Sequence, residues 1–270
     1  MDLANNVLLG CIAGDVIGSA FDYTNLKTTS FNLFSKNAKF SRATVMTMAV
    51  ADALMNGKDL EENIWDFTTR YNRVKYNENF VKWLLKDETY IEFADDNYSL
   101  VRIAPVGLFA NNLKDLERKS RRSVLATHVS SSVMFYAQNL AKAIYLFHLD
   151  YTKEYVADYL FKNHKNDFIG TMENIRPGSL FYPSAEFSFY YGYMSFYNSI
   201  DFEDAIRNAI SCGGGDSSSV ATVAGALAMS YYGNMPQEIA EFVMIKLPNE
   251  FAELIIQFQE KSNKRKEVLF

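Results

Sequence analysis

Hydrophobic residues recur at helical spacing through most of this chain. In the first half of the stretch 201–236 they lie three and four positions apart, at Ala205, Ile206, Ala209 and Ile210. This spacing predicts an amphipathic helix. Three glycines, 213–215, end it, and a second helix rich in alanine and glycine follows. Small side chains let a helix lie close to its neighbours, so we expect the second helix in the core.

The turn between these two helices carries polar residues. Asp216 and the serines 217–219 are expected to cap the second helix, because their oxygens can accept from the N–H groups of its first turn. A glycine-rich turn that leads into a helix N-terminus also suits an anion or a phosphate. On this stretch alone, a capped and buried helix is the simpler interpretation.

The same periodicity predicts helices along the rest of the chain. The expected ranges are 3–12, 44–56, 60–72, 79–85, 104–111, 115–127, 130–149, 152–161, 185–197 and 237–261. The aromatic content of 185–197 would also suit a strand, but helix is our prediction. Polar loops are expected over 24–39, 95–102 and most of 163–183. With no alternating strands and no linker, the pattern predicts one all-α domain over 1–262 and a frayed basic tail over 263–270.

Charge and cysteine content narrow the function classes. The net charge of −5 argues against a nucleic-acid surface, and the basic runs 118–122 and 264–266 are interpreted as solvated helix faces. Cys11 and Cys212 have apolar or small neighbours and no metal-ligand spacing, so we expect buried free thiols. Free thiols are typical of a reducing compartment, which favours a cytoplasmic protein.

Two membrane-related interpretations are rejected on the same grounds. The apolar segment 7–21 lacks a basic leader and contains Asp15, so it is not expected to be a signal peptide. No run of about 18 uncharged apolar residues occurs, so no membrane span is predicted.

Four separated stretches carry distinctive motifs. They are 10–22 (GCIAGDVIGSAFD), 40–54 (FSRATVMTMAVADAL), 101–108 with Thr127-His128, and 201–236. In this order they resemble four parts of the ADP-ribosylglycohydrolases, a family that includes dinitrogenase reductase-activating glycohydrolase: the opening, a Thr-Asp-Asp-Thr helix, a middle section and a late Gly-Gly-Asp-Thr-Asp-Thr helix. The resemblance extends from about residue 7 to about residue 240.

This resemblance implies an orthogonal bundle of many helices around a cleft that holds two Mg²⁺ or Mn²⁺ ions. It also implies hydrolysis of the glycosidic bond that joins ADP-ribose to a protein side chain or a small molecule. In the family, the threonine and both aspartates of the early motif and two aspartates and a threonine of the late motif hold the metals. Oxygen ligands of this kind suit hard cations.

This chain departs from the family at those metal positions. Ser41, Arg42 and Ala43 stand where the early motif has threonine and two aspartates. In the late motif Asp216 is retained, whereas the second aspartate and the threonine are replaced by Ser218 and Ser219. Three of the four carboxylates are therefore absent, and one position has become a cation.

Charge balance decides what this departure means. Two dications about 3.8 Å apart repel by roughly 17 kcal/mol at an effective dielectric constant near 20. A metal about 4 Å from the Arg42 guanidinium would add roughly 8 kcal/mol of repulsion. We therefore predict no binuclear site and no metal cofactor. Since a guanidinium pairs well with a carboxylate, we expect Arg42 to pair with Asp216, with Asp15 as a second candidate partner.

Candidate ligand contacts follow from the same resemblance. Asp22 stands where the family has a glutamate that contacts the substrate ribose or the metal-bound water, and 96–99 stands where it has a Gly-Asn-Gly-Ser loop. Side chains in place of those glycines would crowd a ligand that approaches the backbone closely. The candidate ligand-binding residues are Asp15, Asp22, Asn97, Ser99, Gly214, Gly215, Asp216 and Ser217.

The remaining histidine and acidic residues of interest are not expected to take part in catalysis. His128 is expected to be a structural residue at a helix boundary, and the sequence supports no Ser-His-Asp or Cys-His arrangement. The acidic residues nearby are interpreted as solvated: Asp87, Glu88, Asp95 and Asp96.

Three functions remain open. The leading one is a metal-free pseudoenzyme that binds ADP-ribose, a related nucleotide, an ADP-ribosylated protein or another protein partner. An active hydrolase with altered chemistry would use Asp22 and Asp216 as a metal-free acid/base pair. A purely structural subunit would need 187–197 as an exposed aromatic patch, although the core is the expected place for this segment.

Overall fold

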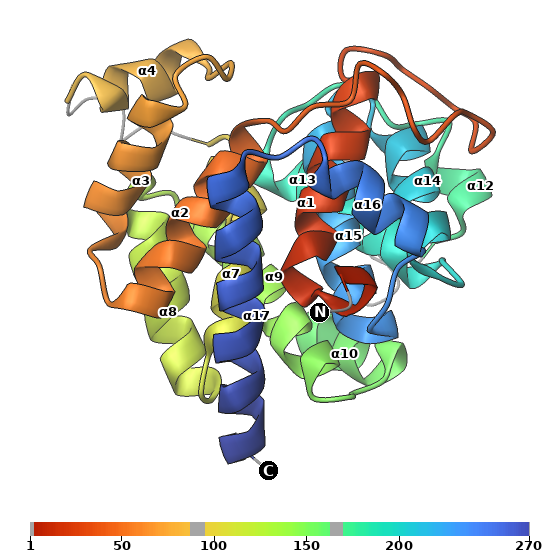
Figure 1. Ribbon diagram of the computed structural model, residues 1–270. Helices are drawn as coiled ribbons and strands as arrows, with labels where there is room; N and C mark the ends of the chain where they lie inside the picture. The colour runs from red at the N-terminus through yellow and green to blue at the C-terminus, as the bar shows by residue number, and fades with distance from the viewer. Residues whose placement is uncertain (1–2, 87–94, 163–169, 270) are drawn as a thin grey trace.

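Helices are the only regular elements among the described residues 3–86, 95–162 and 170–269 of the computed structural model (Figure 1). The all-α prediction is confirmed. In chain order the helices are η1 (Leu3–Asn5), α1 (Val7–Gly18), η2 (Ser19–Phe21), α2 (Arg42–Asn56), α3 (Leu60–Arg70), α4 (Glu78–Leu84), α6 (Tyr98–Val101), α7 (Ala104–Phe109), α8 (Leu113–Leu125), α9 (Ser131–His148), α10 (Lys153–Phe161), α12 (Met172–Ile175), α13 (Ala185–Tyr197), α14 (Phe202–Cys212), α15 (Ser217–Tyr232), α16 (Gln237–Met244) and α17 (Asn249–Leu269).

The α1–α15 pair forms the centre of one half of the molecule (Figure 1). Gly10, Gly14 and Gly18 recur every four residues and therefore share one face of α1. A Cβ on Gly14 would overlap the Ala221 carbonyl, so the two backbones touch there. The close packing expected of the second helix of 201–236 is confirmed, but the prediction that the first helix ends at residue 12 is wrong. The glycines lie inside the helix, where they permit this contact.

Helices α13 and α14 pack around α15. The aromatic residues Phe187, Phe189, Tyr193 and Phe196 of α13 are buried. The segment 185–197 forms α13, so helix was the correct prediction. Because these rings are buried, the aromatic residues belong to the core and do not form an exposed patch. The inward positions predicted for α14 are also buried.

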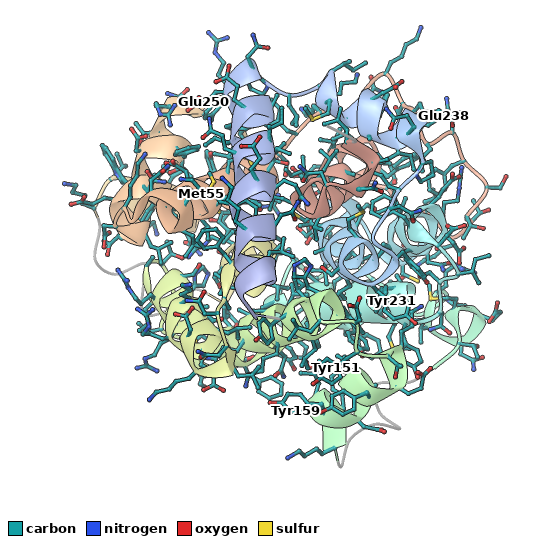
Figure 2. All side chains as sticks on the ribbon, turned by 60° about the horizontal axis from the view of Figure 1, so that its bottom comes forward. Met55, Tyr151, Tyr159, Tyr231, Glu238 and Glu250 are labelled. Carbon is teal, nitrogen blue, oxygen red and sulfur yellow. The ribbon has the colours of Figure 1, made fainter. Side chains whose placement is uncertain are left out.

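The other half of the molecule is built on α2, which packs against α3, α7 and α17. Ser41 caps α2 by accepting from the Ala43 N–H, and Gly57 ends it with a φ of +66°. Glu250, at the start of α17 (Figure 2), accepts from Arg70 and Tyr71 and so connects α17 to the end of α3.

The structure differs from two of the expected loops and from the expected tail. The expected loop 95–102 contains α6, and its residues 97–101 are buried. Tyr98, Leu100 and Val101 supply the apolar contacts that draw it inward. In the expected loop 163–183, α12 forms over Met172–Ile175, and 163–169 lies outside the described residues, as do Asp87 and Glu88. Helix α17 runs to Leu269, through the expected tail.

Cys11 and Cys212 are buried and free, as predicted. Among the described residues, no helix combines the length and the apolar character that crossing a bilayer requires.

Candidate functional site

One pocket forms where the starts of α2, α6 and α15 meet the loop that follows α1. Its volume is about 150 Å³. It brings together residues from three of the stretches that stood out in the sequence. The lining residues are Asp22, Tyr23, Arg42, Lys75, Tyr76, Asn77, Asp96, Asn97, Tyr98, Phe181, Pro183, Gly215 and Asp216.

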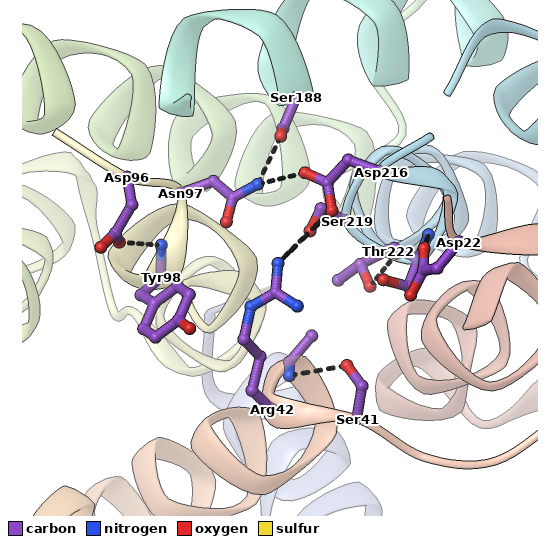
Figure 3. A network of polar contacts seen from close by, with 12 residues as sticks. Asp22, Ser41, Arg42, Asp96, Asn97, Tyr98, Ser188, Asp216, Ser219 and Thr222 are labelled. Atoms are coloured by element: carbon purple, nitrogen blue, oxygen red, sulfur yellow. Dashed lines mark hydrogen bonds and ion pairs between the residues drawn. The ribbon is translucent and has the colours of Figure 1, made fainter. Parts of the chain in front are cut away.

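Arg42 crosses this pocket from the first residue of α2 to the start of α15 (Figure 3). Its Nη2 donates to Ser219 Oγ at 3.0 Å and lies 3.4 Å from Asp216 Oδ1. The guanidinium carbon also lies 5.0 Å from the centre of the Tyr98 ring. Burial alone would lower the pKa of Arg42, but the carboxylates around it, Asp216 first, raise it above its ordinary value. The predicted Arg42–Asp216 pair is confirmed, and Arg42 is a cation at all relevant pH values.

The Asp216 carboxylate is shared between three side chains. Oδ1 accepts from Ser219 Oγ at 2.9 Å as well as facing Arg42, and Oδ2 accepts from Asn97 Nδ2 at 2.7 Å. Asn97 Nδ2 also donates to Ser188 Oγ (Figure 3). Asp216 occupies the N-cap position of α15 but makes no side-chain capping bond. The predicted N-cap position is therefore confirmed, but the expected side-chain bond is not formed, because charge-assisted bonds to Arg42 and Asn97 take its oxygens instead.

Asp15 organises the start of α2 instead of pairing with Arg42. Ser41 and Thr44 each donate to this carboxylate through both the backbone N–H and the side-chain hydroxyl. These bonds occupy both oxygens of a fully buried side chain. Burial raises the pKa of Asp15, and the hydrogen bonds only partly offset this effect. Asp15 as a second partner of Arg42 is therefore not observed.

Asp22 supplies the cap that Asp216 does not. Its Oδ1 accepts from the Ser218 N–H, in the first turn of α15, at 2.9 Å. Burial is the main cause that raises the pKa of Asp22 to about 7, and the charge of Asp216 adds to it. The Ser218 N–H and the Arg42 cation oppose this shift. Asp22 consequently titrates near neutral pH while facing the pocket.

The glycine turn before α15 is covered on two sides. Gly214 has a φ of +58°, and a Cβ there would lie 2.6 Å from the Leu180 carbonyl. Gly215 has a φ of +109°, and its carbonyl accepts from the Tyr23 N–H at 2.8 Å. Glycine is required at both positions because a side chain would be strained there.

The predicted ligand-binding residues therefore divide into two groups. Those that line the pocket are Asp22, Asn97, Gly215 and Asp216, whereas the other four, Asp15, Ser99, Gly214 and Ser217, do not. Ser99 and Ser217 are fully buried, and Ser217 Oγ lies 3.4 Å from the Phe21 carbonyl. Whether the lining residues contact a ligand stays a prediction.

Asp96 is not the solvated acid that the sequence indicated. Its Oδ1 lies 3.1 Å from His128 Nε2 and accepts from the Tyr98 N–H, and its Oδ2 accepts from Asn77 Nδ2. Burial would raise the pKa of Asp96, but the hydrogen bond and charge of His128 outweigh this effect and lower the pKa to about 2. His128 is itself buried and does not line the pocket, which agrees with its predicted structural role. Asp95 is exposed, as expected.

Sequence reasoning missed much of the pocket wall. Tyr23, Lys75 and Phe181 lie in loops without periodicity, far apart in the chain. Tyr23 and Phe181 pack against the glycine turn, and Lys75 lies beside Tyr23, an arrangement that no local pattern reveals. The only available signal was the aromatic run Phe181-Tyr182 beside Pro183.

Comparisons with known proteins show the family and the fold of the chain. The sequence profile of the ADP-ribosylglycohydrolase family matches residues 1–260. This chain belongs to the ADP-ribosylglycohydrolase family. Among solved structures, an "ADP-ribosylglycohydrolase-related protein complex" matches with a TM-score of 0.72, 22% identity and coverage of 97% of this chain and 98% of that chain. At that identity the match shows the shared fold alone. A search of curated proteins gave no match.

The residues at the metal positions of this ADP-ribosylglycohydrolase family member do not fit a binuclear Mg²⁺ or Mn²⁺ centre. Ala43 offers no donor atom, and the one retained carboxylate, Asp216, already faces the Arg42 guanidinium. Ser41 Oγ is bonded to Asp15, and Ser219 Oγ to Asp216. No group of three or more histidine, cysteine, aspartate or glutamate side chains suited to a metal occurs among the described residues. One carboxylate beside a fixed cation cannot balance two dications.

Proposed function

We propose that this ADP-ribosylglycohydrolase family member is a metal-free pseudoenzyme that binds ADP-ribose, a related nucleotide or an ADP-ribosylated partner protein in the Arg42 pocket. The observation that carries the proposal is the position of the Arg42 guanidinium, bonded to Ser219 and facing Asp216. It provides a permanent positive charge at the positions from which the family's metals are held. The free buried thiols Cys11 and Cys212 are consistent with action in the reducing cytoplasm.

The pocket also retains unused hydrogen-bonding capacity. Arg42 Nε, a donor, and Asn97 Oδ1, an acceptor, are both buried without a protein partner. Leaving such atoms unpaired costs free energy, so a ligand that satisfies them gains affinity. A sugar hydroxyl can accept from one group and donate to the other. This pairing supports a ribose-containing ligand and requires no metal.

A thermal-shift titration with ADP-ribose, in EDTA and with added Mg²⁺ or Mn²⁺, tests the proposal. We expect stabilisation by ADP-ribose of equal size under all three conditions, because the cation of the site is part of the chain. Stabilisation that disappears in EDTA would contradict the metal-free site. Absence of any shift would contradict nucleotide binding and favour a role in protein interaction alone.

A second function is supported by the protonation of Asp22. A carboxyl with a pKa of about 7 can act as a general acid, and Asp216 provides a second carboxylate in the same pocket. In this case Asp22 would protonate the leaving group as the glycosidic bond breaks. Asp216 would accept a proton from the water that attacks the anomeric carbon from the opposite side. The test is release of ADP-ribose from a modified protein in EDTA. Release that declines as the pH rises through 7 and is abolished by Asp22→Asn would establish the hydrolase and overturn the pseudoenzyme.

A further inference from the structure

Two exposed aromatic rings stand at the entrance of the Arg42 pocket. Tyr23 is 74% exposed and Phe181 is 52% exposed, yet both line the pocket. Their ring centres are 6.4 Å apart, and the ring planes are inclined by 38°. We call Tyr23, Phe181 and the neighbouring Lys75 the aromatic rim.

The backbone holds both rings in place. Tyr23 has a φ of +64°, a conformation that residues with a Cβ rarely adopt, and its N–H donates to the Gly215 carbonyl. On the other side, a Cβ on Gly215 would lie 3.1 Å from Phe181 Cδ2, so the Phe181 ring rests on this glycine. Lys27 Nζ donates to the carbonyls of Arg176 and Ser179, which secures the loop before Phe181. Unfavourable backbone conformations that present exposed side chains are concentrated at ligand sites.

Lys75 adds a positive charge to the rim. Its Nζ lies 5.1 Å from the centre of the Tyr23 ring and 3.4 Å from the Tyr23 hydroxyl. Lys75 forms no ion pair with any described residue. Two exposed rings beside an unpaired cation match the two chemical parts of a nucleotide, a planar base and a phosphate.

We propose that the aromatic rim binds the base of a nucleotide and that Lys75 binds its phosphate, while a sugar occupies the interior beside Arg42 and Asn97. Two rings must be about 7 Å apart to hold a third between them. The two ring centres are 6.4 Å apart, and a small rotation of one exposed ring would bring this distance to about 7 Å. This inference rests on the proposed nucleotide-binding function and adds the orientation of the ligand.

Isothermal titration calorimetry with ADP-ribose and with ribose 5-phosphate, which has no base, tests the rim. We expect Phe181→Ala and Tyr23→Asn each to weaken ADP-ribose binding about ten-fold and to leave ribose 5-phosphate binding unchanged. Asparagine is chosen because it tolerates a positive φ, so the backbone at residue 23 is retained. Tyr23→Phe keeps the ring but loses the hydroxyl beside Lys75, so it should recover most of the ADP-ribose affinity that Tyr23→Asn loses.

The matched control is Tyr182→Ala. Tyr182 lies in the same loop and is 63% exposed, but it does not line the pocket. We expect this variant to bind both ligands normally, and melting curves will confirm that every variant is folded. If the wild type binds ADP-ribose and the two rim variants bind it equally well, the rim is overturned and the proposed function stands. If the wild type binds neither ligand, the proposed function fails together with the rim.

Discussion

Arg42 changes the character of the site because its charge is permanent. A metal ion can dissociate or be chelated, whereas a guanidinium is carried by the chain and keeps its proton at any relevant pH. Its partner Asp216 is held from the other side by Asn97. The pair therefore has a defined geometry before any ligand arrives, and preorganised groups bind with a smaller loss of entropy.

At the same scale, Asp22 makes folding stability depend on pH. Its pKa is about 7 in the folded protein, against an ordinary value of 3.8. Between these values the folded state binds the additional proton, so this residue costs stability as the pH rises from about 4 to about 7. Below about pH 4 Asp22 does not change the free energy of unfolding, and above about pH 7 its full destabilising effect is present.

We therefore predict that Asp22→Asn gains stability over the wild type as the pH rises. The gain at pH 8 should be on the order of 2 kcal/mol, less than the full shift implies because Asp22 is partly exposed. Asparagine retains an oxygen that can accept from the Ser218 N–H. Urea denaturation at about pH 4 and pH 8 measures the effect, and a gain that is equal at both pH values would contradict the assignment to Asp22.

At the scale of elements, the contact between α1 and α15 depends on the absence of side chains. Alanine is a better helix former than glycine by about 1 kcal/mol, so Gly14→Ala would stabilise a free helix. In this fold the added Cβ would overlap the Ala221 carbonyl, which belongs to backbone and cannot rotate away.

We predict that Gly14→Ala lowers the free energy of unfolding by about 3 kcal/mol. The cost of pushing α1 and α15 apart is larger than the gain in helix propensity. The matched control is Gly178→Ala, whose Cβ would lie 3.9 Å from the nearest carbonyl, Ile175 O. It should change stability by less than about 0.5 kcal/mol. Denaturant unfolding of both variants measures the effect. Equal losses of unfolding free energy in the two variants would show that the close approach of α1 and α15 is not the cause.

The same elements show how far the sequence could be interpreted. Periodicity located most helices because helical spacing is a local property, as in the buried face of α14. Helix α6 is only four residues long, too short to show a period. Asn97, which precedes it, is buried because its amide contacts Ser188 and Asp216, far along the chain. Local reasoning assigned Asp216 to the nearest N–H groups, whereas its partner Arg42 is 174 residues away. That pair was predictable only through the family motifs.

At the scale of the whole molecule, the chain has an all-helical fold and belongs to the family. Arg42, Ala43 and Ser218 stand where the family motifs led us to expect metal-binding carboxylates. The guanidinium of Arg42 spans the gap between α2 and the start of α15.

We predict that restoring the carboxylates restores metal binding. The triple variant Arg42→Asp, Ala43→Asp, Ser218→Asp should be less stable than the wild type in EDTA, because like charges are then crowded together. Mn²⁺ at 100 times its dissociation constant should add about 2.7 kcal/mol, which is a shift of roughly 5 to 10 °C in Tm. Differential scanning fluorimetry with and without Mn²⁺ measures it. Arg42→Met, which removes the cation alone, is the control that should show no such gain, and an equal shift in the wild type would contradict the predicted loss.

The packing of α1 on α15 has a consequence for how the protein is made. These helices are separated by roughly 200 residues, from Gly18 to Ser217. At 5 to 20 residues per second, a ribosome needs about 10 to 40 s to synthesise that interval. Throughout this time the emerging N-terminal helix exposes an apolar surface whose partner does not yet exist. Binding by chaperones during translation is therefore expected to fall on residues 7–18. The pocket beside Arg42 is completed only once the chain through Asp216 has left the ribosome.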